Sequence, residues 1–515
     1  MFDSHLLYIF AEENFFNELD VKGMIEILNI KTLQDDNKLI GEILNKLNIC
    51  SMSIKSSILN LSNLLDTLRE DLVIAIEYEY VDAMYRDEYY RFYATKFHHY
   101  ARNCARISFF EPGILIPGES VDYTKSKEII EQYLGFVVVR PIGKCIGRNV
   151  ISVKAKRKGC DDVAICQAGV HTTALGLKVC VHGFPHSSQD GEMMACAETA
   201  LWSIAEYYGH KYPRYTPVSP SEILDAMRPS SYQRQLPSRG LTFHQISIGL
   251  RTFGFSPEAY QLYVNDSNGM VLDEEMKEVF TCYVESGFPL AICLQGGIIG
   301  HAVVCVGRNS DKPKNLKPEV INGRNLLFYN QSVDEFVFND DNFPCYQKTQ
   351  LQTPTSYYSD PEWSKVLLTK FIVPLPSKVY MNASIAIQQS KILLGYFAPD
   401  NAVVRTYLAS CRSFRHHIAT SRLMSNENKE IMIRFELPRF IWITEFGTMD
   451  EYNNDIASGL IILDATEPND KSTNSLILAI NGNCGVAYNT ESLSYENLNL
   501  PIGFLMERFY NIINC

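Results

Sequence analysis

The sequence predicts an α+β protein built from three successive regions. Apolar and aromatic residues recur at helical spacing over residues 1 to about 105, above all in 72–102, and predict a helical N-terminal region. Valine-rich segments bounded by glycine and proline begin near residue 133 and predict strands. After about residue 353 helical stretches and strands are mixed. We therefore expect boundaries at 1–130, 131–352 and 353–515, which suits a chain of 515 residues.

The middle region alternates capped helices with short strands. Ser219 with Glu222, and Thr242 with Gln245, have the form of capping boxes and predict two helix starts. A third helix is expected over 273–286, where a glycine and a proline follow. The segments LLFYN and EFVFND then predict two further strands.

One uncharged stretch, 287–307, is long enough to cross a membrane. It contains Pro289 and His301, and a glycine-rich turn divides it into two apolar runs, 290–295 and 301–306. Short apolar runs around glycines are typical of buried strands, so we expect two paired strands here and no membrane span.

The C-terminal region is expected to be α+β in its own right. Its spacing predicts helices near 382–397 and 401–418. The apolar segments RFIWITEF, GLIILDAT and LILAIN predict strands that follow them.

Composition narrows the classes of function. The net charge is −12, which argues against a nucleic-acid binder, because such proteins need a basic face. Fourteen cysteines are spread irregularly along a long chain, which favours reduced thiols over a disulfide framework. The N-terminus lacks the features of a signal peptide. We therefore expect a cytoplasmic protein without a membrane or nucleic-acid partner.

The segment from residue 187 to 209 carries the strongest chemical signal. Apolar spacing after Asp190 predicts a helix that starts near 191–193, with Cys196 in about its first turn. The free N–H groups and the positive end of a helix dipole stabilise a thiolate, the nucleophilic form of cysteine. Gln189, seven residues upstream, carries an amide suited to donate to an oxyanion.

A thiolate nucleophile needs a proton relay, and His301 is the best-placed histidine. It follows a glycine turn and opens the strand HAVVCVG. The strand EFVFND ends in Asn339, Asp340 and Asp341, each of which offers an acceptor that can orient an imidazole. If the two strands are neighbours, the order along the chain is Gln, Cys, His and Asp.

QDGEMMAC, GHAVVCVG and FVFNDD together resemble the papain-like cysteine peptidase superfamily, in particular the bacterial branch that processes double-glycine leader peptides. The resemblance covers about residues 185–345. It implies a central helix that bears the cysteine and packs on an antiparallel sheet. It assigns Cys196 as nucleophile, His301 as general base and acid, Asp340 as orienter and Gln189 as oxyanion-hole donor. Met193 and its two successors depart from the small residues usual before the cysteine.

The resemblance implies a cysteine protease, a hydrolase that cleaves a peptide or isopeptide bond in a protein or peptide through a thioester, without a cofactor. Two alternatives stay open. The same intermediate would serve a cysteine-dependent acyl or amide transferase, and a catalytically inactive papain-like scaffold would act in binding or regulation.

A zinc site is a competing interpretation. Three cysteines and three histidines lie within a short stretch of the middle region, but their spacing matches no standard zinc motif. We therefore expect no metal there. The residues are Cys160, Cys166, His171, Cys180, His182 and His186.

Overall fold

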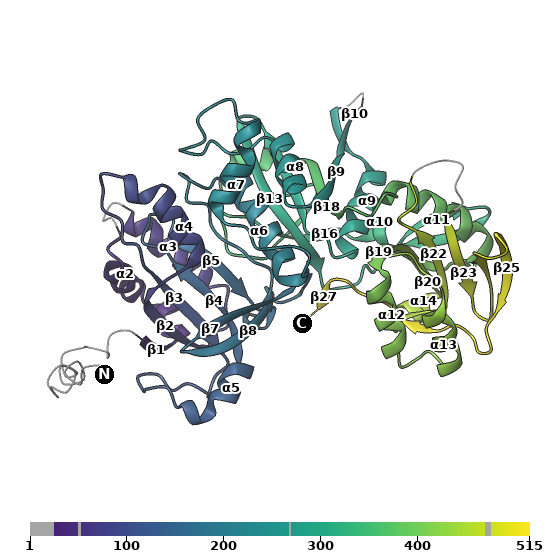
Figure 1. Cartoon of the computed structure of the whole chain (residues 1–515), viewed down its shortest axis with the longest axis horizontal. Coiled ribbons are helices and arrows are strands. Elements are labelled where there is room, and N and C mark those ends of the chain that lie inside the picture. Colours follow the sequence, from purple (N-terminus) through teal and green to yellow (C-terminus); the bar gives the residue numbers. More distant parts are fainter. Residues whose placement is uncertain (1–24, 50–52, 267–268, 469–474, 515) are drawn as a thin grey trace, which may run out of the picture. The chain divides into compact units, whose positions relative to one another are not determined.

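The computed structural model describes residues 25–49, 53–266, 269–468 and 475–514 (Figure 1). The chain divides into two compact units. The first comprises the chain up to Val150 together with His171–Val181, and the second comprises Ile151–Val170 and His182–Cys515. Both contain helices and strands, so the α+β class is confirmed. In the part of the chain that is described, no helix is long and apolar enough to cross a membrane.

The first unit contains a five-stranded sheet in the order β1-β2-β3-β4-β5. The prediction of a helical N-terminal region is wrong here, since the described part combines this sheet with helices. β2 lies inside the sheet and buries neighbouring residues on both faces, so its apolar run lacks the alternation that marks a half-exposed strand. Residues 1–24 of the predicted region lie outside the described residues. The strands are β1 (Ile25–Asn29), β2 (Val73–Tyr80), β3 (Cys104–Phe110), β4 (Tyr133–Val139) and β5 (Ile146–Ile151), and the helices are α1 (Ile30–Asp35), α2 (Asn37–Lys46), α3 (Ile54–Leu65), α4 (Ala83–Arg91) and α5 (Ser126–Glu131).

The second unit contains an eight-stranded sheet with the main order β17-β16-β13-β12-β18-β9, in which β6 also pairs with β13 and β27 pairs with β6. The two strands predicted around the glycine turn are confirmed as the antiparallel pair β12–β13. β18 lies between β12 and β9, so this sheet continues beyond residue 352. The strands are β6 (Val163–Ile165), β9 (Phe255–Gln261), β12 (Leu290–Gly296), β13 (Ile299–Asn309), β16 (Glu335–Asn339), β17 (Gln347–Gln350), β18 (Leu367–Pro376) and β27 (Ile513–Asn514).

Helices pack against this sheet, and α6 (Cys196–Lys211) lies against β13. Both capping boxes are confirmed, at the starts of α7 (Pro220–Met227) and α8 (Phe243–Thr252). Gly249 lets α8 approach α6 closely, because a Cβ there would lie 2.4 Å from a methyl group of Leu201. The third predicted helix is α9 (Glu274–Glu285).

This unit also contains a second eight-stranded sheet, with the order β14-β15-β19-β20-β22-β23-β24-β25, and the two-stranded sheets β10-β11 (Tyr263–Asp266 and Gly269–Leu272) and β21-β26 (Ile456–Ala457 and Met506–Glu507). The first two strands of the second eight-stranded sheet come from the chain between β13 and β16. The chain therefore leaves the first sheet after β13, adds two strands to the second sheet, and returns to the first sheet at β16. The helix predicted over 401–418 is wrong in its first half, where the β-branched and buried residues form β19 (Val403–Ser410) before α12 (Cys411–Thr420). The other elements are β14 (Lys317–Ile321), β15 (Arg324–Phe328), α10 (Tyr329–Ser332), α11 (Ala383–Phe397), α13 (Asn426–Arg434), β20 (Phe440–Gly447), α14 (Met449–Asn453), β22 (Gly459–Asp464), β23 (Leu476–Asn481), β24 (Cys484–Asn489) and β25 (Ser494–Asn499).

A buried ionic network joins the elements of the two sheets. Glu285, at the end of α9, pairs with Arg308 of β13 and, at 2.7 Å, with Arg405 of β19. Arg405 also pairs with Glu445 of β20 at 3.0 Å, and Arg508 reaches the same carboxylate at 3.2 Å. These side chains are almost completely buried. The network therefore ties the strand that bears His301 to the second sheet.

Candidate active site

A tight turn before α6 places Cys196. One carboxylate oxygen of Asp190 accepts hydrogen bonds from the backbone N–H groups of Glu192, Met193 and Met194, at 2.8–2.9 Å. The helix therefore starts at Cys196 itself, a few residues later than predicted, because Asp190 holds the preceding residues in a non-helical turn. Cys196 is partly exposed at the helix N-terminus, where unpaired N–H groups and the helix dipole favour an anion.

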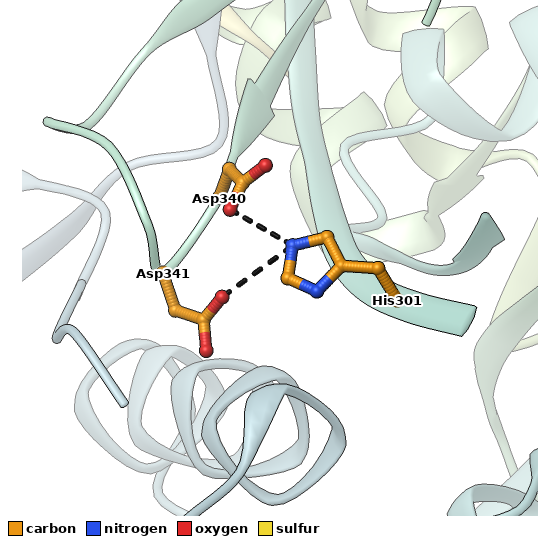
Figure 2. Close-up of side chains that lie close together, drawn as sticks. All are labelled: His301, Asp340 and Asp341. Atoms are coloured by element: carbon orange, nitrogen blue, oxygen red, sulfur yellow. Dashed lines mark hydrogen bonds and ion pairs between the residues drawn. The ribbon is translucent and has the colours of Figure 1, made fainter. Parts of the chain in front are cut away.

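The strand arrangement brings His301 and Asp340 together. β13 and β16 are antiparallel neighbours, which is the condition for His301 to meet the end of β16. His301 Nε2 lies 2.9 Å from Asp340 Oδ1 and 3.5 Å from Asp341 Oδ1. Figure 2 shows both carboxylates facing this one ring nitrogen. The Asn339 side chain instead accepts from the backbone N–H of Tyr346 at 2.9 Å.

The surroundings of His301 favour its charged form. Burial alone would lower its pKa, but the charge of Asp340, the hydrogen bond with Asp340 and the influence of the nearby Cys196 side chain outweigh that effect. The charge of Asp341 acts in the same direction, and the pKa of His301 lies well above its usual range. A protonated imidazole beside a thiol favours the thiolate.

Asp340 is held by hydrogen bonds on both carboxylate oxygens. Oδ1 accepts from the backbone N–H of Asn342 at 2.9 Å as well as from His301. Oδ2 accepts from the hydroxyls of Tyr357 and Tyr358, at 3.0 and 2.8 Å. Burial alone would raise the pKa of Asp340, but the charge and hydrogen bond of His301, together with these donors, lower it below its usual value.

Aromatic rings from the segment 357–363 cover the histidine–carboxylate pair. Tyr358 stacks on Trp363 with ring centroids 3.7 Å apart, and Trp363 meets His301 edge to face at 5.5 Å. Sequence reasoning missed these residues, which lie beyond the region of resemblance. The signal available was three aromatic residues in an otherwise polar segment, SYYSDPEW.

Replacing Tyr358 by Phe should shift the pH dependence of the site. Loss of this donor raises the pKa of Asp340, so the carboxylate becomes protonated at higher pH on acidification. We expect the acid limb of the rate of Cys196 alkylation to move up by up to about one pH unit, the equivalent of one hydrogen bond. Tyr232→Phe, at an exposed tyrosine, is the control. An unchanged acid limb in Tyr358→Phe would contradict this role.

Gln189 lies beside the same loop. Its amide N–H donates to Asn342 Oδ1 at 3.0 Å, and Asn342 also holds Asp340 through its backbone. The structure thus brings Gln189 to the segment that carries Asp340, and the turn of Asp190 connects it to Cys196.

His186, considered above as a zinc ligand, has a structural position. It is buried, and burial lowers its pKa to about 4, so its ring is neutral. Its Nε2 bonds with the backbone oxygen of Asp340 at 3.1 Å. His186 therefore supports the backbone of the segment that approaches His301.

Within the described residues, one group of three potential metal ligands comes together, and it is His301, Asp340 and Asp341, with ligand atoms within 4.8 Å of one another. Asp340 uses both oxygens for two hydrogen bonds each. A carboxylate has about four lone-pair sites, so an ion there would have to displace a hydrogen bond.

Comparison with known proteins yields little. No protein-family model matches the chain, and no curated protein matches it. Among solved structures, the peptidase domain of Streptococcus ComA, a bi-functional ABC transporter of a quorum-sensing pathway, is similar to part of it. The identity is 14%, the match covers 35% of this chain and 91% of that domain, and the TM-score is 0.20. A likeness at this level assigns neither fold nor activity.

Proposed function

We propose that the protein is a papain-like cysteine hydrolase that cleaves a peptide or isopeptide bond, with Cys196 as nucleophile, His301 as base and acid, and Asp340 as orienter. The observation that carries this proposal is the hydrogen bond of 2.9 Å between His301 and Asp340, and Cys196 lies near enough to His301 to act on the pKa of its imidazole. Cys196 is the first residue of α6, and His301 lies on a strand of an antiparallel sheet. These positions support the arrangement that the resemblance implies.

The proposed reaction begins with an ion pair. Nε2 of His301 faces Asp340, so Nδ1 is the nitrogen available to the Cys196 thiol, and proton transfer gives a thiolate and an imidazolium. The thiolate attacks the substrate carbonyl carbon, and the imidazolium protonates the departing amine, leaving a thioester. A water molecule then loses its proton to the imidazole and attacks the thioester, which releases the acid and restores the thiol.

Asp340 is preferred to Asp341 as the orienter. It lies 2.9 Å from His301 Nε2, against 3.5 Å for Asp341, and both of its oxygens are fixed by further donors. A carboxylate held on both oxygens fixes the ring and stabilises the imidazolium without rotating.

Gln189 is proposed as the oxyanion-hole donor together with the backbone N–H of Cys196. Replacing Gln189 by Ala should lower kcat by about 10²-fold with a smaller effect on KM, since the donor acts on charge that develops in the transition state. Steady-state kinetics would check this. A change in KM alone would instead make Gln189 a substrate-binding residue.

The substrate class can be tested directly. Peptides and proteins from a cell extract, kept under reducing conditions, are incubated with the wild type and with Cys196→Ala. Cys293→Ala, which replaces a thiol on β12, is the control variant. We expect new N-termini, or released isopeptide-linked chains, with the wild type and Cys293→Ala but not with Cys196→Ala. Acyl transfer to added amines without hydrolysis would favour the transferase alternative, and no Cys196-dependent product would favour the inactive scaffold.

The reduced thiols fit this chemistry. The cysteines within the described ranges are free, with no disulfide among them. We therefore propose that the protein works in the cytoplasm, where a thiolate nucleophile stays reduced. We propose that 1–130, 131–352 and 353–515 are three regions of sequence distributed over the two compact units and not three separate domains, since the central sheet takes β18 from beyond residue 352.

A further inference from the structure

A small cavity lies at the far end of the helix that begins with Cys196. It has a volume of about 120 Å³ and lies between the end of α6, the turn after α9, and the adjoining ends of β19, α12 and β20. A benzene ring fits a cavity of roughly 150 Å³. The space is therefore of the size of one aromatic ring.

Aromatic residues form part of the wall of this cavity. Tyr208, Tyr212 and Tyr215 contribute rings from α6 and the loop after it, and Phe288 and Phe440 contribute rings from the other elements. The ring of Tyr208 lies 5.7 Å from that of Tyr212, at an interplanar angle of 30°, and 5.4 Å from that of Tyr215. Such surfaces favour a flat ring through stacked and edge-to-face contacts.

One buried polar atom in this wall has no partner. Tyr208 is 3% exposed, and its hydroxyl makes no hydrogen bond within the described residues. A buried hydroxyl left unbonded is costly, and such groups in native proteins call for a partner. Because Tyr208 lines the cavity, a ligand placed there can supply that partner.

The charge at the cavity selects an anion. Arg214 and Arg439 line it, and no acidic residue does among the described lining residues. Both guanidinium charges act on the Tyr215 hydroxyl, where they oppose the rise in its pKa that burial causes. Ser410 and Ser413 also line the cavity, at the N-terminus of the ten-residue helix α12, whose dipole adds positive potential.

We propose that this cavity is a binding site for a small aromatic anion, a single ring bearing a carboxylate or comparable acidic group. The ring would occupy the space between the tyrosines, and the anionic group would face Arg214 and Arg439. The site lies at the opposite end of α6 from Cys196, so binding does not depend on the thiol.

Benzoate is the probe, observed by saturation-transfer NMR on the full-length protein. We expect benzoate to bind at millimolar concentration, more tightly than uncharged benzamide and than cyclohexanecarboxylate, which lacks the ring. Tyr208→Phe should weaken binding about three- to tenfold, as loss of one hydrogen bond does. The double variant Arg214→Gln, Arg439→Gln should abolish it.

Two controls separate this site from the rest of the molecule. Arg251→Gln, at an exposed arginine of α8, and Cys196→Ala should bind benzoate like the wild type. Absence of benzoate binding, equal binding of benzamide, or unchanged binding in the double arginine variant would each overturn the proposal. Loss of binding in Cys196→Ala would also overturn it, by placing benzoate in the proposed active site.

Discussion

Cys196→Ala is expected to lower the rate of substrate hydrolysis by about 10⁴- to 10⁶-fold, because it removes the atom that forms the thioester. The fold should be unaffected. Residue 196 is the first residue of α6 and is partly exposed, and alanine is the best helix former. Kinetics with a substrate found in the extract experiment, together with circular dichroism, would check both halves of this prediction.

Cys293→Ala is the matched control for that variant. Cys293 is also a free, partly buried thiol in the same unit, on the strand beside His301, but it lies within β12 and not at a helix N-terminus. Its replacement should leave the rate within about twofold. Equal losses in both variants would contradict the assignment of Cys196 and would point to a general need for these thiols in folding.

Glu285→Ala should destabilise the second unit by about 3–5 kcal/mol. The change removes the carboxylate partner of the buried Arg308 and one of the two carboxylate partners of the buried Arg405, and an uncompensated buried charge is costly. All three tryptophans of the chain, Trp202, Trp363 and Trp442, lie in this unit. Tryptophan fluorescence during urea unfolding therefore reports on it alone.

The control for the Glu285 variant is a surface ion pair. Glu274, on the same helix, pairs with Lys317 at 2.8 Å, but its side chain is 61% exposed. Such pairs contribute little, so Glu274→Ala should leave the midpoint of unfolding close to that of the wild type. A loss below about 1 kcal/mol in Glu285→Ala would show that the buried network is not what holds the two sheets together.

Local sequence signals predicted the elements that carry the site. Each functional side chain lies within a few residues of a recognisable sequence pattern. These patterns are the turn before Cys196, the glycine turn before His301 and the strand end at Asp340. The exact start of α6 was missed because Asp190 captures three backbone N–H groups, a contact that apolar spacing does not reveal.

Contacts between distant segments were beyond prediction. Tyr357 and Tyr358 bind Asp340 across a turn and a strand, and no periodic pattern marks a side chain as a hydrogen-bond donor to a carboxylate. The transfer of β14 and β15 to the second sheet was missed for the same reason, since pairing with β19 depends on a segment 75 residues or so away. The interior strand β2 was mistaken for a helix because burial on both faces hides the period of two.

The most direct test of the account is the rate at which iodoacetamide alkylates each cysteine at about pH 6, measured by peptide mapping. An ordinary thiol is almost fully protonated there, so only a thiolate stabilised by its surroundings reacts quickly. We predict that Cys196 reacts about tenfold or more faster than Cys484, which is more exposed, and that His301→Ala removes the difference. Equal rates for Cys196 and Cys484 in the wild type, or a fast Cys196 in His301→Ala, would contradict the proposed active site.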